Sequence, residues 1–231
     1  MRERIALITG AASGIGAAVG SELSRRGWIT VGLDLRPAAH TDHGVGVDVA
    51  DPAQVQATIQ RIERELGPIE AAVCSAGHYA MAPVADITWA DWHRMLRVHV
   101  GGLLNVCRAV TPGMVRRGGG SVVAVTSELA IGGGDGDAHY AAAKGAVIGL
   151  VRSLAAELGP SGVRVNAVAP GPTDTPLNPP DSPWRDPVYL RTLPAQRLVT
   201  PEEVALTAAF LIEEATFCCG EVISPNAGAV I

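Results

Sequence analysis

Short apolar runs that alternate with longer helical segments are the feature that most constrains how this chain folds. The runs have strand length and little polar alternation, and they lie at 5–9, 29–33, 45–47, 70–75, 121–126, 163–168 and 221–224. Strands buried on both faces have this pattern, which is typical of a parallel sheet with helices on each side. Between the runs, helical patterns extend from a glycine-rich turn to about residue 26 and over 52–66, 88–117, 139–158 and 200–213. We therefore predict one doubly wound α/β domain over residues 1–231.

Two helix starts and one long irregular stretch stand out along the chain. Asp51 precedes Pro52 as a predicted N-cap, and Thr200 and Glu203 have the spacing of a capping box. The stretch 173–200 is rich in proline and long for a simple connection. Loops of this length in a compact domain are often lids over a binding site, so we expect a substrate lid here.

Composition and charge exclude several classes of partner. A chain of 231 residues with 48% hydrophobic content can bury one sizeable core. The net charge of −5 is spread without a basic stripe, so neither nucleic acid nor a membrane surface is an expected partner. We expect no bilayer span and no signal peptide. The cysteines have neither zinc-site nor CxxC spacing, which favours a reduced, cytoplasmic protein without a metal: Cys74, Cys107, Cys218 and Cys219.

A glycine-rich turn connects the first predicted strand to the first predicted helix. It reads Thr9-Gly10-Ala-Ala-Ser-Gly14-Ile-Gly16, with glycines spaced as G-x-x-x-G-x-G. Glycines at these positions let the backbone approach a pyrophosphate, whose charge is favoured by the helix N-terminus. Such a turn alone could be only a turn, but a strand before it and a helix after it favour nucleotide binding.

Asp34, at the end of the second predicted strand, points to the identity of the nucleotide. It lies 18 residues beyond Gly16, where a carboxylate can accept hydrogen bonds from both ribose hydroxyls and would repel a 2′-phosphate. A solvated strand-end aspartate is the alternative. Ser13 offers no positive charge to a 2′-phosphate, so NAD is favoured over NADP. Arg36 could offer that charge, so NADP is not excluded.

Tyr140 and Lys144 are four residues apart on a predicted helix and therefore share one face. A free tyrosine, with a pKa near ~10, is a poor base at neutral pH. A neighbouring ammonium group lowers that pKa and would let Tyr140 exchange a proton with an alcohol or carbonyl oxygen. A surface pair would look identical, but this pair follows a buried strand that ends close to Ser127.

Together these residues resemble the short-chain dehydrogenase/reductase family, over essentially the whole chain. The matching elements are the turn 9–16, Asp48-Val49, Ser75-Ala-Gly77, Ser127, Tyr140 with Lys144, Asn166 and Pro170-Gly171. The resemblance implies a Rossmann-like fold. In that family Ser127 would bind the substrate oxygen, Tyr140 would donate or accept its proton, and Lys144 would hold the nicotinamide ribose and tune Tyr140.

The resemblance also implies contacts with the cofactor. Asp48 and Val49 would meet the adenine, while Ala76 and Gly77 would pass beside the adenosine ribose. Thr173 and Thr175 would anchor the carboxamide and phosphate end. The predicted cofactor-binding residues are therefore Gly10, Ser13, Gly14, Ile15, Gly16, Asp34, Asp48, Val49, Ala76, Gly77, Tyr140, Lys144, Pro170, Thr173 and Thr175.

Several positions depart from the family pattern. His99 stands where an asparagine usually supports a water linked to the lysine, so it is a fourth candidate catalytic residue, through its backbone carbonyl or its imidazole; a buried structural histidine is the alternative. Cys74 replaces an asparagine and is expected in the core. Only 13 residues separate Asp34 from Asp48, which predicts a short loop over 36–44 instead of a helix.

Residues of two segments near the expected substrate remain open to two interpretations. Glu128, directly after Ser127, either selects a polar or hydroxylated substrate or is solvated at the rim, and the rim is favoured. Arg185 and Arg191, in the stretch 173–200, either recognise a carboxylate or phosphate or are surface arginines, which is the commoner outcome.

The function favoured by these patterns is hydride transfer between NAD(H) and a secondary alcohol or ketone. The alternatives are an NADPH-type ketoreductase acting on a 3-oxoacyl or polyketide-like substrate, and a nucleotide-binding regulator without catalysis. The resemblance further implies a homo-oligomer, a tetramer or dimer, built through paired long helices and the C-terminal segment 224–231.

Overall fold

Seven parallel strands form the centre of the computed structural model, which describes residues 4–231. The sheet has the order β3-β2-β1-β4-β5-β6-β7. The strands are β1 (Arg4–Thr9), β2 (Trp28–Asp34), β3 (His43–Gly46), β4 (Ile69–Cys74), β5 (Gly120–Val125), β6 (Val163–Val168) and β7 (Val222–Ile223). All seven predicted strands are present, with ends that differ by one or two residues. The expectation of no signal peptide concerns the first residues, of which 1–3 lie outside the described part.

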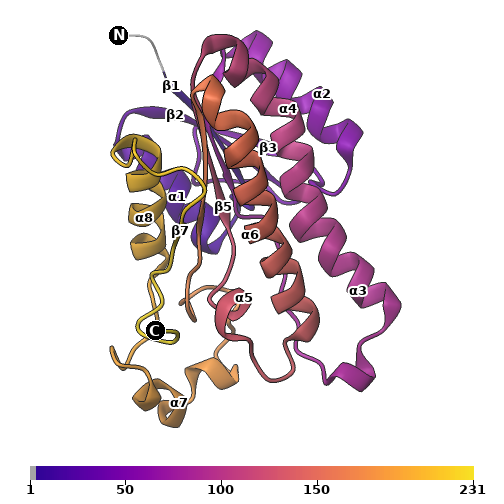
Figure 1. Cartoon of the computed structure of the whole chain (residues 1–231), viewed down its shortest axis with the longest axis vertical. Coiled ribbons are helices and arrows are strands. Elements are labelled where there is room, and N and C mark those ends of the chain that lie inside the picture. The colour runs from indigo at the N-terminus through magenta and orange to yellow at the C-terminus, as the bar shows by residue number, and fades with distance from the viewer. Residues whose placement is uncertain (1–3) are drawn as a thin grey trace.

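Helices cover both faces of the sheet, as Figure 1 shows. One face carries α1 (Gly14–Arg25) and α8 (Pro201–Glu213), which pack on each other and on the apolar residues of β1, β4 and β5. The other face carries α2 (Pro52–Glu65), α4 (Gly102–Arg117) and α6 (Ala138–Leu158). This confirms the doubly wound, Rossmann-like architecture. Among the described helices, none combines the length and apolar character needed to cross a membrane.

Both predicted helix starts are confirmed. The Asp51 carboxylate accepts hydrogen bonds from the backbone N–H groups of Ala53 and Gln54, with Pro52 at the first position of α2. At α8, the Thr200 hydroxyl accepts from the Glu203 N–H, and the Glu203 carboxylate accepts from the Thr200 N–H. These contacts satisfy backbone donors that a helix N-terminus otherwise leaves unpaired.

The predicted helix over 88–117 is not regular along its length. It consists of α3 (Trp89–Leu96), one π-helical turn (Arg97–Gly101) and α4. The wider turn buries His99, and directly after it Gly102 packs against Val49, where a Cβ atom would lie 2.9 Å from Val49 Cγ2. A π turn inside an α-helix often occurs at a functional site.

The connection between β2 and β3 contains no helix, as the short spacing predicted. Asp42 closes this loop, because its carboxylate accepts hydrogen bonds from the backbone N–H and the hydroxyl of Thr30. Those bonds, with one from Ser24, outweigh burial and lower the pKa of Asp42. The loop between β2 and β3 is therefore held to β2 by side-chain hydrogen bonds.

The strand order places a crevice at one edge of the sheet. The chain runs outward from β1 to β3, then returns to β4 and continues in the other direction to β7. The connections that follow β1 and β4 therefore separate at their carboxyl ends, where open α/β sheets bind ligands. The short helices α5 (Leu129–Gly132) and α7 (Pro187–Thr192) lie near this edge, at the bottom of Figure 1.

Candidate active site

A cavity of about 640 Å³ occupies the crevice at the carboxyl ends of the strands. It extends from the glycine turn and Asp34, past the ends of β4 and β5, to α6 and the segment after β6. Every predicted site residue except Gly16 lines it. The lining also includes residues that were not predicted as site residues, among them Tyr79, Arg94, Glu128, Leu177, Asn178 and Trp184.

The glycine turn is packed too closely to admit side chains. Gly10 has a φ of +69°, and a Cβ atom there would lie 2.9 Å from the Cα of Ala76. A Cβ atom at Gly16 would lie 2.2 Å from the Gly10 carbonyl oxygen. Gly16 therefore does not face the cavity; it lets the first turn of α1 rest on the loop. Ser13, the N-cap of α1, makes no side-chain capping bond to the helix, and the helix start faces the cavity through Gly14 and Ile15.

Asp34 is held in place by the same loop. Its Oδ2 accepts a hydrogen bond from the Ala12 N–H at 3.1 Å, and its Oδ1 accepts from the Arg36 N–H at 3.0 Å. The exposed Arg36 side chain extends over this region, donating to Ser13 Oγ at 3.1 Å. A carboxylate and an exposed guanidinium group thus both border the place expected for a ribose.

The adenine side is positioned by residues outside the expected contacts. The Thr9 hydroxyl accepts hydrogen bonds from the N–H groups of Ser75 and Ala76, each at 3.1 Å, which fixes the end of β4 beside the glycine turn. On α4, the Asn105 amide donates to the Val49 carbonyl at 2.9 Å. The cavity wall near Asp48 and Val49 is therefore anchored to β1 and α4.

Ser127, Tyr140 and Lys144 come together at the end of β5, and all three are buried. The Lys144 Nζ donates to the Val125 carbonyl at 2.8 Å and lies 5.6 Å from the centre of the Tyr140 ring. The Thr126 hydroxyl donates to the Lys144 carbonyl at 2.8 Å, which ties α6 to the strand end. The predicted helical spacing thus places the phenol and the amine on one face, beside the serine.

The electrostatics of this group differ from the expectation that Lys144 lowers the pKa of Tyr140. Burial raises the pKa of Tyr140 above its ordinary value, and the charge of Glu128 adds to this, while a hydrogen bond with Ser127 opposes it. Burial lowers the pKa of Lys144 to about 7. The reason is desolvation, which disfavours both the phenolate and the ammonium. In this arrangement Tyr140 is a neutral phenol at pH 7.

His99 is buried against the reacting group. Its Nε2 lies 2.8 Å from the His78 carbonyl oxygen, and its ring packs edge-on to Tyr140 with centroids 5.5 Å apart. Gly77 makes room for the imidazole, since a Cβ atom there would lie 2.4 Å from His99 Cε1. Burial lowers the pKa of His99 to about 2, so the ring is neutral at working pH. A second cavity of about 10 Å³, the size of one water molecule, separates His99 from Lys144.

Glu128 is not solvated at the rim, so that interpretation is wrong. The residue is only 5% exposed and lines the main cavity next to Ser127. Its Oε2 accepts a hydrogen bond from the Ser127 hydroxyl at 3.0 Å. Burial raises the pKa of Glu128 to about 7. Sequence reasoning missed the burial because glycines and aspartates dominate the segment that follows.

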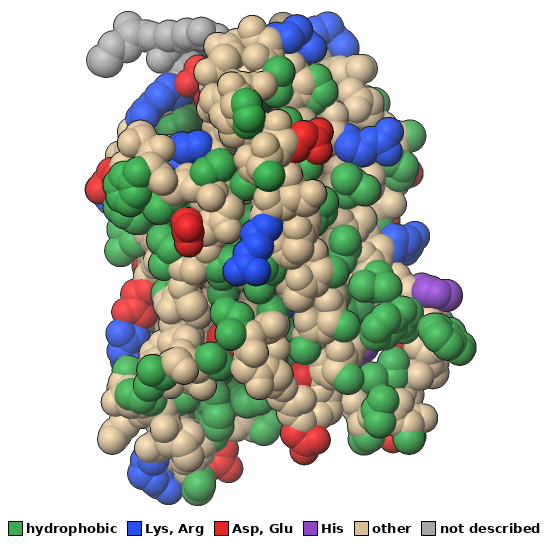
Figure 2. All heavy atoms as spheres, in the orientation of Figure 1, with side chains coloured by type: hydrophobic (Ala, Val, Ile, Leu, Met, Phe, Trp, Pro, Cys, Tyr) green, Lys and Arg blue, Asp and Glu red, His purple; other side chains and the backbone are tan. Residues whose placement is uncertain are grey.

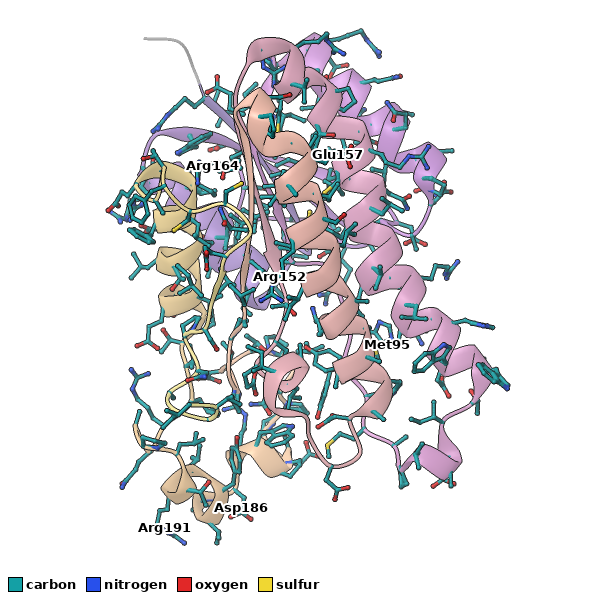
Figure 3. All side chains as sticks on the ribbon, in the orientation of Figure 1. Met95, Arg152, Glu157, Arg164, Asp186 and Arg191 are labelled. Atoms are coloured by element: carbon teal, nitrogen blue, oxygen red, sulfur yellow. The ribbon has the colours of Figure 1, made fainter. Side chains whose placement is uncertain are left out.

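The segment 173–200 is tied to the cavity through Trp184. Its indole N–H donates to the Tyr79 hydroxyl at 3.0 Å, and that hydroxyl donates to Asp137 Oδ1 at 2.7 Å. Arg185 instead pairs with Asp174, and Figure 3 shows Arg191 projecting from α7 away from the body of the molecule. Neither arginine lines the cavity, so the surface interpretation holds for both.

None of the four cysteines lines the main cavity. All four are free, and Cys74 and Cys107 are buried in the core. Burial raises the pKa of Cys74 well above its ordinary value, which disfavours a thiolate nucleophile. Within residues 4–231, no group of three or more His, Cys, Asp or Glu side chains has an arrangement that could hold a metal ion.

One cavity thus combines a glycine turn at a helix start, an acidic residue at the end of β2 and a buried Ser–Tyr–Lys group. This combination defines a dinucleotide-dependent oxidoreductase of the Rossmann type. The family model described as enoyl-(acyl carrier protein) reductase matches residues 10–229. The chain belongs to the short-chain dehydrogenase/reductase family.

Named relatives include enzymes that differ in the direction of the reaction. The chain is 36% identical to D-threitol dehydrogenase of Mycolicibacterium smegmatis, over 92% of this chain and 86% of the relative. It is 32% identical to a 3-oxoacyl-[acyl-carrier-protein] reductase of Thermotoga maritima, over 99% and 98%. The structure resembles that of a putative NAD(P)-dependent gluconate 5-dehydrogenase of Beutenbergia cavernae with bound NADP: TM-score 0.91, 29% identity, coverage 97% and 96%.

Proposed function

We propose that this oxidoreductase transfers hydride between NAD(H) and the carbon of a secondary alcohol or ketone. The observation that carries the proposal is the placement of Ser127, Tyr140 and Lys144 in the same cavity as Asp34 and the glycine turn. The residues fit a dinucleotide, because the helix start faces the place of a pyrophosphate and Asp34 that of a ribose. The bound cofactor supplies or accepts the hydride.

The side chains of this chain manage the proton. Tyr140, a buried neutral phenol, donates its proton to the oxygen of a ketone as the carbonyl is reduced. When an alcohol is oxidised, Tyr140 first passes that proton to Lys144, and the phenolate then takes the proton of the alcohol. Ser127 turns its one hydroxyl proton from Glu128 to the same oxygen and holds it by a hydrogen bond. Lys144 holds the nicotinamide ribose and restores the proton of Tyr140. His99, which is neutral, contributes its backbone carbonyl to a water in the adjoining small cavity.

NAD is the proposed cofactor, with NADP less favoured. The Asp34 carboxylate would repel a 2′-phosphate, and it lines the cavity. Arg36 is the one argument for NADP, since it is exposed and contacts Ser13 at the same place. The contacts proposed for the remaining cofactor are those of Asp48, Val49, Ala76, Gly77, Pro170, Thr173 and Thr175.

A spectrophotometric screen at 340 nm tests the proposal. The chain is offered a panel of secondary alcohols and ketones with NAD(H) and with NADP(H). Turnover with NAD(H) supports it. Turnover only of 3-oxoacyl thioesters with NADPH would instead support the ketoreductase alternative. Binding of NADH without turnover of any compound would support the nucleotide-binding regulator.

Three further expectations belong to this proposal. The residues 1–231 form one catalytic domain, with 173–200 as its substrate lid, and the enzyme acts in the cytoplasm. It assembles as a homo-oligomer, which is supported by the partly exposed apolar residues Leu104 and Val115 on α4. Figure 2 shows hydrophobic side chains distributed over the visible face, with charged side chains scattered among them. Light scattering after size-exclusion chromatography gives the mass, and a monomer would contradict the assembly.

A further inference from the structure

The carboxylate of Glu128 has a position that the proton transfer does not require. It lies beside Ser127, lines the substrate end of the cavity and is 5% exposed. Its Oε2 accepts a hydrogen bond from the Ser127 hydroxyl, and the backbone N–H groups of Glu128 and Leu129 also stabilise the carboxylate and lower its pKa. Among the ion pairs of the described residues, none includes Glu128. A buried carboxylate without a cation is costly, and it is usually kept where a ligand donates to it.

The groups around Glu128 favour a neutral donor over a charged one. The charge of Asp137 acts on it from the start of α6, and Glu128 in turn raises the pKa of Tyr140 and of Tyr189 on α7. The exposed Arg94 already brings positive charge to the cavity, and Lys144 adds to it below its pKa of about 7. A substrate hydroxyl therefore suits this place better than an ammonium group.

The same geometry disfavours two other substrate chemistries. A carboxylate on the carbon next to the reacting carbon would face Glu128 as a like charge. A 3-oxoacyl thioester carries carbonyl groups on this side, which accept hydrogen bonds and cannot satisfy an ionised acceptor. A vicinal hydroxyl is a donor, and it would lie beside the oxygen that Ser127 holds, on the side where the Glu128 carboxylate contacts Ser127.

Resting on the proposed function, we infer that Glu128 is a specificity-determining residue that accepts a hydrogen bond from a hydroxyl next to the reacting carbon. The substrate class is then a 1,2-diol or polyol. Ser127 and Tyr140 bind the oxygen that is oxidised, and Glu128 binds its neighbour. The residue acts on the choice of substrate.

The experiment compares three alcohols that share a reacting carbon bearing a methyl group. They are 1,2-propanediol, 2-butanol and lactate. Besides the methyl group, their reacting carbon carries CH2OH, CH2CH3 and COO−, respectively. A second series has a longer alkyl chain in place of the methyl group. Rates with NAD are measured at pH 8.5, where Glu128 is ionised because its pKa is about 7. The variants are Glu128→Leu and Glu128→Gln, with Asp135→Asn as the matched carboxylate control, exposed on the same segment.

The wild type is expected to prefer the diol over 2-butanol by roughly tenfold or more in kcat/KM, as for a hydrogen bond to a charged group. Glu128→Leu removes this preference by raising KM for the diol more than KM for 2-butanol. Glu128→Gln keeps part of the preference, and Asp135→Asn keeps all of it. Equal use of diol and 2-butanol by the wild type, or an unchanged preference in Glu128→Leu, overturns the inference alone. Absence of turnover of the whole panel by the wild type overturns the proposed function, and the inference with it.

Discussion

Tyr140 is the residue on which the chemistry depends. Its phenol is buried and neutral. It lies next to Ser127, and Lys144 follows it one turn later on the same helix. Replacing Tyr140 by Phe is expected to lower kcat by roughly 10²- to 10⁴-fold, the usual contribution of general acid–base catalysis. NADH binding, followed by fluorescence, should stay within about threefold of the wild type. Full NAD-linked turnover by Tyr140→Phe would contradict the proton role.

Asp34 determines the proposed preference for NAD. Asp34→Asn removes the charge and keeps one oxygen, which can accept from the Ala12 N–H, while the bond from the Arg36 N–H is lost. The ratio of kcat/KM for NADP to that for NAD is expected to rise roughly tenfold or more, because a like-charge contact is removed. Adding Arg36→Ala should cancel the gain. An unchanged ratio in the single variant would show that Asp34 does not read the ribose.

His99 has a backbone role in the proposed site. His99→Asn should therefore leave kcat within roughly tenfold, and it should lower stability by about 1 kcal/mol through loss of the contact with the His78 carbonyl. Steady-state turnover and urea denaturation measure the two effects separately. Near-complete loss of turnover in a folded variant would show that the imidazole itself is needed.

The predictable site residues are those whose spacing along the chain determines their place. Gly10 to Gly16, Asp34, and Tyr140 with Lys144 follow or occupy regular elements, so the period of the strand or helix locates them. Glu128, Tyr79 and Asp137 were missed as site residues because each lies in or beside a loop. Their burial depends on how the segment around Trp184 packs, and periodicity does not specify this. The pKa of Tyr140 was mispredicted because burial outweighs a nearby amine.

Helix α1 carries the cofactor end of the site, and its position depends on close backbone contact. Gly16→Ala would place a Cβ atom 2.2 Å from the Gly10 carbonyl, so α1 must move. We expect a loss of stability of roughly 2–3 kcal/mol, as for overpacking, together with weaker NADH binding. The control is Gly149→Ala on α6, where nothing lies within 4 Å and a gain of up to about 1 kcal/mol is expected from helix propensity. Equal effects of the two changes would contradict this account.

The helix starts were predictable, whereas the π turn was not. Asp51 and Thr200 carry their capping partners within three residues, so the signal is local. The turn over 97–101 widens the helix to bury His99 beside Gly77 and to set Gly102 against Val49, contacts between segments far apart in sequence. The hydrophobic pattern along the sequence does not indicate such contacts between distant segments.

Burial of Lys144 should make the free energy of unfolding of the whole molecule depend on pH. Its pKa falls from the model-compound value of 10.5 to about 7 on folding. Between these values the unfolded chain binds a proton that the folded chain does not, so the free energy of unfolding rises with pH. Urea denaturation should show a rise between pH 7 and 9 that is larger in the wild type than in Lys144→Met, by up to about 2 kcal/mol. Equal rises in the two proteins would mean that the amine stays charged when folded.

The reversal of strand order between β1 and β4 has a consequence for how such a protein can change over time. The carboxylate proposed to read the nucleotide lies on β2, whereas the residues proposed to read the substrate lie after β5 and β6, on the other side of the reversal. Mutations can thus accumulate in one region without disturbing the other. Cofactor choice and substrate choice can be inherited as separate traits, and a new substrate can be acquired while the older nucleotide preference persists.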